Sequence, residues 1–387
     1  MLVELDAALA ERRASGLMRE RRVIDGAQGP RVRIGERDFI AFASNDYLGL
    51  ANAPELVDAL CSAARAWGAG AGASHLIVGH QRPHELLEQD LAEYVAPCEG
   101  ARALALSSGY LANLAILTAL AGRNDAIFAD RLNHACLTDG ALLSRASLTR
   151  YPHRDVAALR DALASTRARR RFIVTDAVFS MDGDVAPLPE LLELAHAHDA
   201  WLVVDDAHGF GVLGGGRGSL AHFGLAHERI VYMGTLGKAA GVAGAFVAAH
   251  PLVIETLVQT ARSYVYTTAA PAALAETLRT ALQCIRDGDA RRAKLATLIA
   301  AFRARAEALP WTLFASSTPI QPLMVREVET VVRVSEALAA RGILVPAIRP
   351  PTVPAGTARL RVSLSAAHTL DDVDLLTRAL SEVAADA

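Results

Sequence analysis

Cysteine and long apolar runs are both scarce in this sequence. No C-x-x-C pair occurs among its four cysteines (Cys61, Cys98, Cys136 and Cys284), which argues against a disulfide framework and a thiolate zinc site. No apolar run reaches the roughly 18 residues that a membrane span needs. The N-terminal segment MLVELDAALAERR carries acidic residues, unlike the basic start of a signal peptide. We therefore expect a cytoplasmic protein with no membrane partner.

An excess of charge of one sign is also absent. The 387 residues include 39 Lys and Arg against 42 Asp and Glu, so the formal net charge is only −3. No overall field would attract nucleic acid, and we expect no nucleic-acid partner. Apolar residues make up 52% and charged residues 21%, which are the proportions of a folded globular protein and exclude a disordered chain.

Lysine is nearly absent, and this makes the two lysines informative. Only Lys238 and Lys294 are present, so arginine fills almost every cationic position. Lys294 lies in ARRAKLATLIAAFRARAEAL, a segment of helical periodicity in which a solvated face explains it. Lys238 lies in the glycine-rich stretch TLGKAAGVAG, where that explanation fails. We therefore expect a chemical role for Lys238.

Between about residues 100 and 250, short apolar runs alternate with segments of helical periodicity. Apolar runs of this length are typical of buried strands, and their alternation with helices predicts an α/β fold with a mostly parallel sheet covered on both faces. The runs are ALALSS at 103, AIFAD at 126, FIVTDAV at 172, WLVVDDA at 201, RIVYMGT at 229 and AGAFVAA at 243. Residues 1–45 predict an amphipathic helix and short strands, residues 46–275 a large domain, and residues 276–387 a smaller α/β domain.

Small and polar residues follow several of these runs. They are Ser107, Ser108 and Gly109 after the first run, Ser180 to Gly183 after the third, Asp205, Asp206 and His208 at the fourth, and Thr235 and Lys238 after the fifth. Ligands bind beyond the carboxyl ends of the strands in such a sheet. Loops without a function would scatter these residues over both ends, so their convergence predicts one shared site.

Three of these features together describe a site for pyridoxal 5′-phosphate. The segment SSGYLAN places small residues between a strand and a helix start, where free backbone N–H groups can hold phosphate. Lys238 beside glycines can be partly desolvated, which frees its amine to form an imine with an aldehyde. Asp205 would pair with the pyridine nitrogen and keep it protonated, so that the ring can accept an electron pair.

An ordered series of motifs extends along nearly the whole chain. The motifs are SNDYLGL (44–50), SSGYLAN (107–113), DRLNHA (130–135), VFSMDGD (178–184), VVDDAHGFGVLG (203–214), TLGKAAGVAGA (235–245) and AIRPPTVPAGTARLR (347–361). Through this series the sequence resembles the α-oxoamine synthases, which are fold type I enzymes that depend on pyridoxal phosphate. The resemblance implies a large cofactor-binding domain with a mostly parallel sheet and a smaller C-terminal α/β domain.

The resemblance also implies roles for individual residues. Lys238 would form the imine with the cofactor, Asp205 would meet the ring nitrogen, and His134 would stack on the ring and face the substrate. The other implied cofactor contacts are Ser108, Gly109, Tyr110, Ser180, His208 and Thr235, with Thr267 and Thr268 reaching the phosphate of the neighbouring subunit. The implied substrate contacts are Arg349, Thr352 and Arg19, although Arg19 could equally be a surface charge.

The reaction implied by the resemblance is a decarboxylating condensation of an amino acid with an acyl thioester. The motifs SNDYLGL, FSMDGD and RPPTVPAGTARLR favour the family members of biotin biosynthesis, which use L-alanine and pimeloyl-CoA or pimeloyl-ACP. Family members are homodimers with the site between subunits. A sister enzyme such as glycine C-acetyltransferase is the nearest alternative, because one methyl group gives only about 1 to 3 kcal/mol of discrimination.

Alternatives from other classes are weaker. A G-x-G-x-x-G motif follows a predicted strand at Gly209, Gly211 and Gly214, as in a nicotinamide oxidoreductase. The residues after it do not begin a helix, which that motif requires. A hydrolase built from Ser180, His208 and Asp205 would lack a G-x-S-x-G elbow and would leave Lys238 without a role. A non-catalytic protein of the same fold would be expected to lose Lys238 or Asp205.

No metal site is expected from the histidines. His196 and His198 form one possible pair, and His80 and His84 form another. Pro83 would break the helical spacing that could align His80 with His84.

Overall fold

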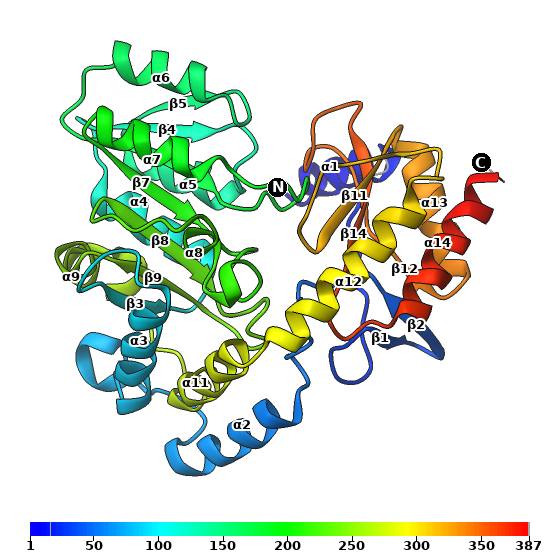
Figure 1. Cartoon of the computed structure of the whole chain (residues 1–387), viewed down its shortest axis with the longest axis horizontal. Helices are drawn as coiled ribbons and strands as arrows, with labels where there is room; N and C mark the ends of the chain where they lie inside the picture. Colours follow the sequence, from blue (N-terminus) through cyan, green and yellow to red (C-terminus); the bar gives the residue numbers. More distant parts are fainter. Residues whose placement is uncertain (16, 386–387) are drawn as a thin grey trace.

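Seven strands form the main sheet of the protein, and six of them come from the predicted apolar runs. The computed structural model describes residues 1–15 and 17–385. The strands are β3 (Arg102–Leu106), β4 (Ala126–Asp130), β5 (Ser147–Tyr151), β6 (Arg171–Asp176), β7 (Ala200–Asp205), β8 (Ile230–Thr235) and β9 (Ala245–Ala249). They lie in the order β3-β9-β8-β7-β6-β4-β5 (Figure 1). Only β9 runs antiparallel to its neighbours, so the prediction of a mostly parallel sheet is confirmed.

The strands are apolar throughout because both faces of the sheet are covered. Consecutive residues of a strand point to opposite faces, and Ile127 and Phe128 of β4 accordingly enter two different hydrophobic clusters, both fully buried. One face is covered by α4 (Gly109–Leu120), α5 (Ala135–Ser144), α9 (Pro251–Thr260) and α10 (Arg262–Val265). The other is covered by α2 (Pro54–Trp67), α3 (Arg82–Val95), α6 (Val156–Ser165), α7 (Leu188–Ala197), α8 (Ser219–Phe223) and α11 (Ala272–Arg286).

A second, antiparallel sheet forms from the C-terminal part of the chain. Its strands are β10 (Thr312–Leu313), β11 (Ile320–Arg326), β14 (Ala358–Ser363) and β13 (Ala347–Ile348), in that order. The helices α13 (Val328–Ala340) and α14 (Leu370–Ala385) lie with it on the right of Figure 1, and the long α12 (Asp289–Ala306) leads to it from the main sheet. The predicted domain boundaries at residues 45 and 275 stay predictions.

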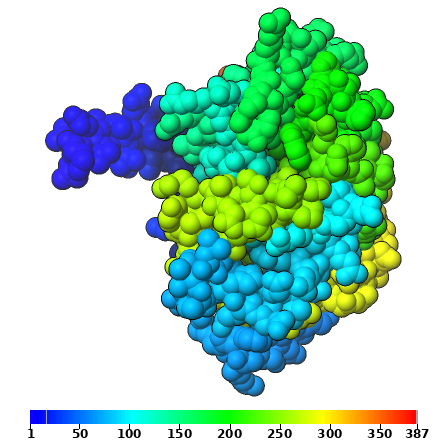
Figure 2. Space-filling model, turned by 90° about the vertical axis from the view of Figure 1, so that its left-hand side faces the viewer, coloured from blue at the N-terminus to red at the C-terminus, as the bar shows by residue number. Residues whose placement is uncertain are grey.

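The N-terminal hairpin joins the C-terminal part of the chain rather than the main sheet. Strand β1 (Arg31–Ile34) pairs with β2 (Arg37–Ala41), and β2 pairs in parallel with β12 (Ile343–Leu344). The predicted N-terminal helix is present as α1 (Leu2–Ala14), but it buries no residue and stands away from the body of the molecule (Figure 2). No helix in the described ranges is long and apolar enough to cross a membrane.

Candidate active site

Most of the predicted cofactor contacts follow strands whose carboxyl ends share one edge of the main sheet. Strands β4, β6, β7 and β8 are parallel, and β3 runs in the same direction as β8 because both are antiparallel to β9. The loops after these strands therefore gather at one edge, which is where ligands bind in open α/β sheets. This edge carries the contacts described below.

Lys238 lies at the centre of a buried hydrogen-bond chain. Its Nζ is 2.9 Å from Nε2 of His208, and Nδ1 of His208 is 2.6 Å from the hydroxyl of Tyr47. Tyr47 donates its only hydroxyl proton to Oδ1 of Asn45 (3.1 Å), so it accepts from Nδ1–H of His208. The Nε2 atom of His208 is then the acceptor for the amine of Lys238.

Burial governs the ionisation of both partners in this contact. Desolvation lowers the pKa of Lys238, and the positive charge of Arg361 lowers it further, against the raising effect of Asp205 and Asp176. Desolvation also holds the pKa of His208 well below its ordinary value, with Lys238 adding to the effect. A neutral His208 and a lysine with a depressed pKa fit an amine that acts as a nucleophile near neutral pH.

Asp205 is held as an oriented, buried carboxylate. Its Oδ2 accepts from Nδ2 of Asn113 (2.6 Å) and its Oδ1 accepts from the backbone N–H of Ala207 (2.9 Å). The adjacent Asp206 is bound instead by the backbone and hydroxyl of Ser219 and by the hydroxyl of Tyr232. Asp206 therefore stabilises the loop that follows β7. Asp205 faces the edge of the sheet at which Lys238 lies.

His134 and Cys136 connect this carboxylate to the next loop. Nδ1 of His134 is 2.8 Å from Sγ of Cys136, and Sγ accepts from Nδ2 of Asn113 (3.0 Å). Burial and the neighbouring Asp205 raise the pKa of the Cys136 thiol to about 12, so Cys136 keeps its proton and donates it to His134. The backbone N–H of His134 donates to Asp176 (2.8 Å). Nδ1 of His134 is therefore occupied, and Nε2 carries the proton of the neutral ring.

The first turn of α4 offers the predicted anion cradle. Ser108 caps the helix by accepting from the backbone N–H of Leu111 (3.3 Å). Within the described part of the chain, the backbone N–H groups of Gly109 and Tyr110 donate to no protein acceptor. Tyr110 donates its hydroxyl proton to Asp139 and leaves its ring partly exposed. These free N–H groups at a helix N-terminus favour a phosphate.

Arg361 is a site residue that the sequence did not reveal. It lies buried on β14 of the second sheet, and its Nε donates to the carbonyl of Ser180 (2.5 Å). Its other nitrogens donate to Ser363 (2.7 Å) and to Oδ1 of Asn45 (3.3 Å). One guanidinium thus connects the loop after β6, the segment SNDYLGL and the second sheet.

The loop after β6 is fixed from its other side by His153. Nε2 of His153 is 2.9 Å from Asp184, and Nδ1 lies 3.1 Å from Asp130 at the end of β4. Burial alone would lower the pKa of His153, but the two carboxylates outweigh it and raise the pKa to about 9. A protonated His153 therefore holds the loop that contains Ser180 in place by bonding Asp184 in that loop and Asp130 in β4.

The ion pairs of His153 with Asp130 and Asp184 predict a pH-dependent contribution to the stability of the fold. The pKa of His153 is about 9 in the folded chain and about 6.5 in the unfolded chain, so its stabilising effect is complete below pH 6.5 and is lost as the pH rises through 9. His153→Gln should lower the free energy of unfolding at pH 6.5 by at most about 3 kcal/mol, and by much less at pH 9.5. Urea unfolding of both proteins at the two pH values measures this, and a difference that does not change with pH would contradict it.

The remaining predicted residues have less contact with this network. Thr235 ends β8 and donates to the carbonyl of Gly244 (3.1 Å). Arg349 donates to the carbonyl of Met18 (3.1 Å), which brings it beside the N-terminal segment that carries the exposed Arg19. Thr352 lies exposed in the turn after Arg349.

Thr267 and Thr268 lie between α10 and α11, and Thr268 forms an isolated β-bridge with Ser74. These two threonines therefore lie beside the segment that precedes α3. No hydrogen bond in the described residues joins either threonine to Lys238. Their predicted role toward a second copy of the chain stays a prediction.

The structure also bears on the weaker alternatives. Turns and the short 3-10 helix η2 (Gly214–Gly216) follow Gly209, so no long helix opens at the G-x-G-x-x-G sequence. Both ring nitrogens of His208 are occupied by Tyr47 and Lys238, which leaves none for Ser180. Helical spacing does not align His80 with His84, since α3 begins only at Arg82, but the expectation that this keeps the pair apart is wrong, because the two rings lie 5.5 Å from each other.

Comparison with known proteins identifies the class to which this site belongs. Residues 37–380 match the family described as aminotransferase class I and II, so the chain belongs to that family. A relative from Nitrosomonas europaea is 58% identical over 388 residues, which cover 99% of this chain and 100% of the relative. A relative from Polaromonas naphthalenivorans is 58% identical and covers 100% of this chain and 98% of its own. Both are named 8-amino-7-oxononanoate synthase.

Solved structures show the same fold. Serine palmitoyltransferase from S. paucimobilis with a bound PLP–myriocin aldimine has a TM-score of 0.93 at 28% identity, and the match covers 100% of this chain and 98% of that one. An 8-amino-7-oxononanoate synthase from Francisella tularensis has a TM-score of 0.77 at 31% identity and covers 89% and 97%. The predicted fold class and the predicted family resemblance are confirmed.

Proposed function

We propose that the protein catalyses the decarboxylating condensation of L-alanine with a pimeloyl thioester in biotin biosynthesis. The products are 8-amino-7-oxononanoate, carbon dioxide and the free thiol of coenzyme A or of an acyl carrier protein. The observation that carries the proposal is the chain Lys238–His208–Tyr47 beside the oriented carboxylate of Asp205, in a protein whose relatives at 55–58% identity are named for this product.

The residues at this edge of the sheet fit pyridoxal phosphate. The N-terminus of α4 supplies two N–H groups that donate to no described residue and can bind a phosphate, Asp205 supplies a buried carboxylate for a ring nitrogen, and Lys238 supplies an amine with a lowered pKa. When bound, the cofactor supplies an aldehyde for that amine and a ring that takes up an electron pair. Ser180, Thr235 and His134 remain proposed contacts on the loops around it.

Each residue of the site has a separate role in the proposed reaction. Lys238 presents its amine to the aldehyde and afterwards removes the proton from Cα of the amino acid, as its depressed pKa permits. His208 accepts a hydrogen bond from that amine and fixes its direction, and His134 presents Nε2–H toward the substrate. Arg349 supplies a cation for the substrate carboxylate, with Thr352 beside it and Arg19 toward the acyl chain.

The active form in this proposal is a cytoplasmic homodimer. Leu76, Ile77 and Val78 are 47%, 73% and 76% exposed, and they lie in the segment that bridges to Thr268 through Ser74. A patch of exposed apolar side chains of this kind supports an interface. Thr267 and Thr268 beside the patch would then reach the phosphate held by a second copy of the chain.

The product formed from defined substrates tests the proposal. The purified protein with pyridoxal phosphate is incubated with L-alanine, glycine or L-serine, each with pimeloyl-CoA, acetyl-CoA or palmitoyl-CoA, and the products are identified by mass spectrometry. We expect product only, or at least about tenfold faster, with L-alanine and pimeloyl-CoA. Faster turnover of glycine with acetyl-CoA would assign the protein to a sister enzyme and overturn the proposed substrates.

A further inference from the structure

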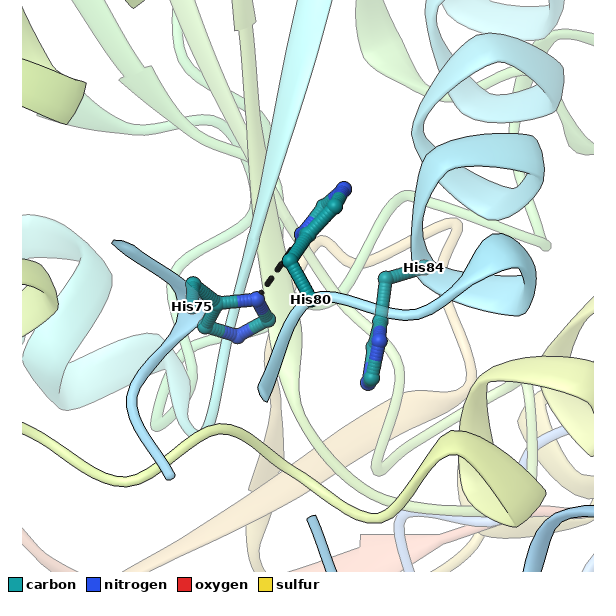
Figure 3. Close-up of side chains that lie close together, drawn as sticks. All are labelled: His75, His80 and His84. Atoms are coloured by element: carbon teal, nitrogen blue, oxygen red, sulfur yellow. Dashed lines mark hydrogen bonds between the residues drawn. The ribbon is translucent and has the colours of Figure 1, made fainter. Parts of the chain in front are cut away.

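Three histidines that take no part in the site above converge at the N-terminus of α3. His75 lies in the short π-helical turn η1 (His75–Gly79), His80 lies between this turn and α3, and His84 lies in the first turn of α3. Figure 3 shows the three rings grouped together, with the hydrogen bond between His75 and His80 drawn. One nitrogen atom of each ring lies within 4.8 Å of one nitrogen of the other two.

The spacing of the rings suits a shared metal ion. The ring centroids are 5.2 Å apart for His75 and His80, 5.0 Å for His75 and His84, and 5.5 Å for His80 and His84. Three imidazoles bound tetrahedrally at Zn–N distances of about 2.1 Å place their ring centres roughly 5 Å from one another. The observed ring spacing is therefore close to that of a site built from three imidazoles.

Oxygen acceptors already orient two of the rings. His84 donates from Nε2 to the carbonyl of Ala270 (2.8 Å), and Nε2 of His80 lies 3.4 Å from Oε2 of Glu85. In both rings Nδ1 therefore carries the electron pair, which accepts a hydrogen bond from Nδ1 of His75 in His80 and from the backbone N–H of Gln81 in His84. Metal-binding histidines typically show this arrangement, in which the other ring nitrogen donates to a carbonyl or a carboxylate.

Burial disfavours the charged form of two of the rings. Burial, together with His84 and His80, lowers the pKa of His75 to about 4. Burial is also the main reason that the pKa of His84 is lowered. Neutral imidazole is the form that binds a metal, so burial favours the ligand form of His75 and His84.

We propose that His75, His80 and His84 bind one Zn²⁺ ion through their imidazole nitrogens, with a fourth position open to water. Neutral imidazole is a preferred ligand of Zn²⁺. On binding, the proton shared between Nδ1 of His75 and Nδ1 of His80 moves to Nε2 of His75. Nδ1 of His84 exchanges its hydrogen bond from the backbone of Gln81 (3.0 Å) for the metal.

Such an ion would fasten two segments of the chain together. The hydrogen bond from His84 to Ala270 already joins the first turn of α3 to the residues before α11, and the bridge between Ser74 and Thr268 joins the residue before η1 to the same segment. The ion adds a link from η1 to the first turn of α3. Zn²⁺ should therefore raise the thermal midpoint of unfolding.

Metal titration of the full chain, with any purification tag removed, tests this site. We expect isothermal titration with ZnCl₂ to show one high-affinity site per chain, and Co²⁺ to give the visible absorbance of a tetrahedral complex. His75→Ala and His80→Ala should each weaken binding by more than the roughly 10- to 100-fold loss that follows removal of an outer hydrogen-bond partner. Circular dichroism of each variant verifies that it is folded.

A second pair of histidines provides the control. His196 and His227 have ring centroids 5.9 Å apart, and the backbone N–H of His227 donates to Pro97, beyond the C-terminal end of α3 and not at its N-terminus, so His196→Ala and His227→Ala should leave Zn²⁺ affinity unchanged. The proposal is overturned if the unmodified chain binds no Zn²⁺ at micromolar concentration. It is equally overturned if the folded His75→Ala/His80→Ala double variant still binds one ion with the original affinity.

Discussion

Lys238→Ala should reduce turnover by at least about 10⁴-fold while the protein stays folded. The substitution removes the amine that lies 2.9 Å from His208, and none of the other side chains in this hydrogen-bond chain carries an amine. Rates with L-alanine and pimeloyl-CoA, measured beside the thermal unfolding midpoint, give both quantities.

Lys294 is the matched control for this substitution. It lies on α12, outside the network of the main sheet edge. Lys294→Ala should keep the original rate within about twofold, as expected for a surface change. Retained activity in Lys238→Ala would refute the assignment of the reactive amine.

Asp205→Asn should lower kcat by about 10²- to 10⁴-fold and weaken the binding of pyridoxal phosphate. The amide has almost the same shape as the carboxylate and can still accept from Ala207, but it cannot carry the negative charge that keeps a ring nitrogen protonated. Steady-state rates and a fluorescence titration with the cofactor separate the two effects.

Asp206→Asn is the control that distinguishes the loss of this negative charge from a loss of structure. Asp206 is fully buried, burial raises its pKa to about 6, and it is bound by Ser219 and Tyr232. Asp206→Asn should therefore lower the thermal midpoint and leave kcat nearly unchanged. If Asp206→Asn and not Asp205→Asn removed activity, the catalytic carboxylate would be wrongly assigned.

Much of the main sheet was predictable because its strands are buried on both faces. Such strands are continuous apolar runs, and six of the seven were found in this way. Strand β5 was not, because SLTRY lies at the edge of the sheet and exposes most of its side chains. The pairing of β2 with β12 joins residues about 300 apart in sequence, a contact that no local pattern can indicate.

The site was predictable where a residue type was unusual at the end of a strand. Lys238 stood out because lysine is rare in the chain, and Asp205 because it ends an apolar run. Asp176 also ends such a run and was missed, although it lies directly opposite Asp205 in the paired strands β6 and β7. There it accepts from the backbone N–H of His134, and burial together with Asp205 raises its pKa well above the ordinary value.

Other site residues act through long-range contacts and left no such signal. Arg361 is one of many arginines, and its role depends on reaching Ser180 and Asn45, which are distant in sequence. In the sequence Asn113 is an ordinary helix residue. Only the fold shows that its side chain lies between Cys136 and Asp205 and donates to both. The sequence does not indicate the three-histidine cluster, because Pro83 suggests an interrupted helix, whereas α3 begins beside it at Arg82.

Chemical trapping of the cofactor tests the central claim most directly, because the chain contains only two lysines. The protein is saturated with pyridoxal phosphate, reduced with borohydride, digested and mapped by mass spectrometry. The account predicts one cofactor on the peptide that contains Lys238 and none on the peptide that contains Lys294. A label on Lys294, on the N-terminal amine, or on neither lysine would contradict it.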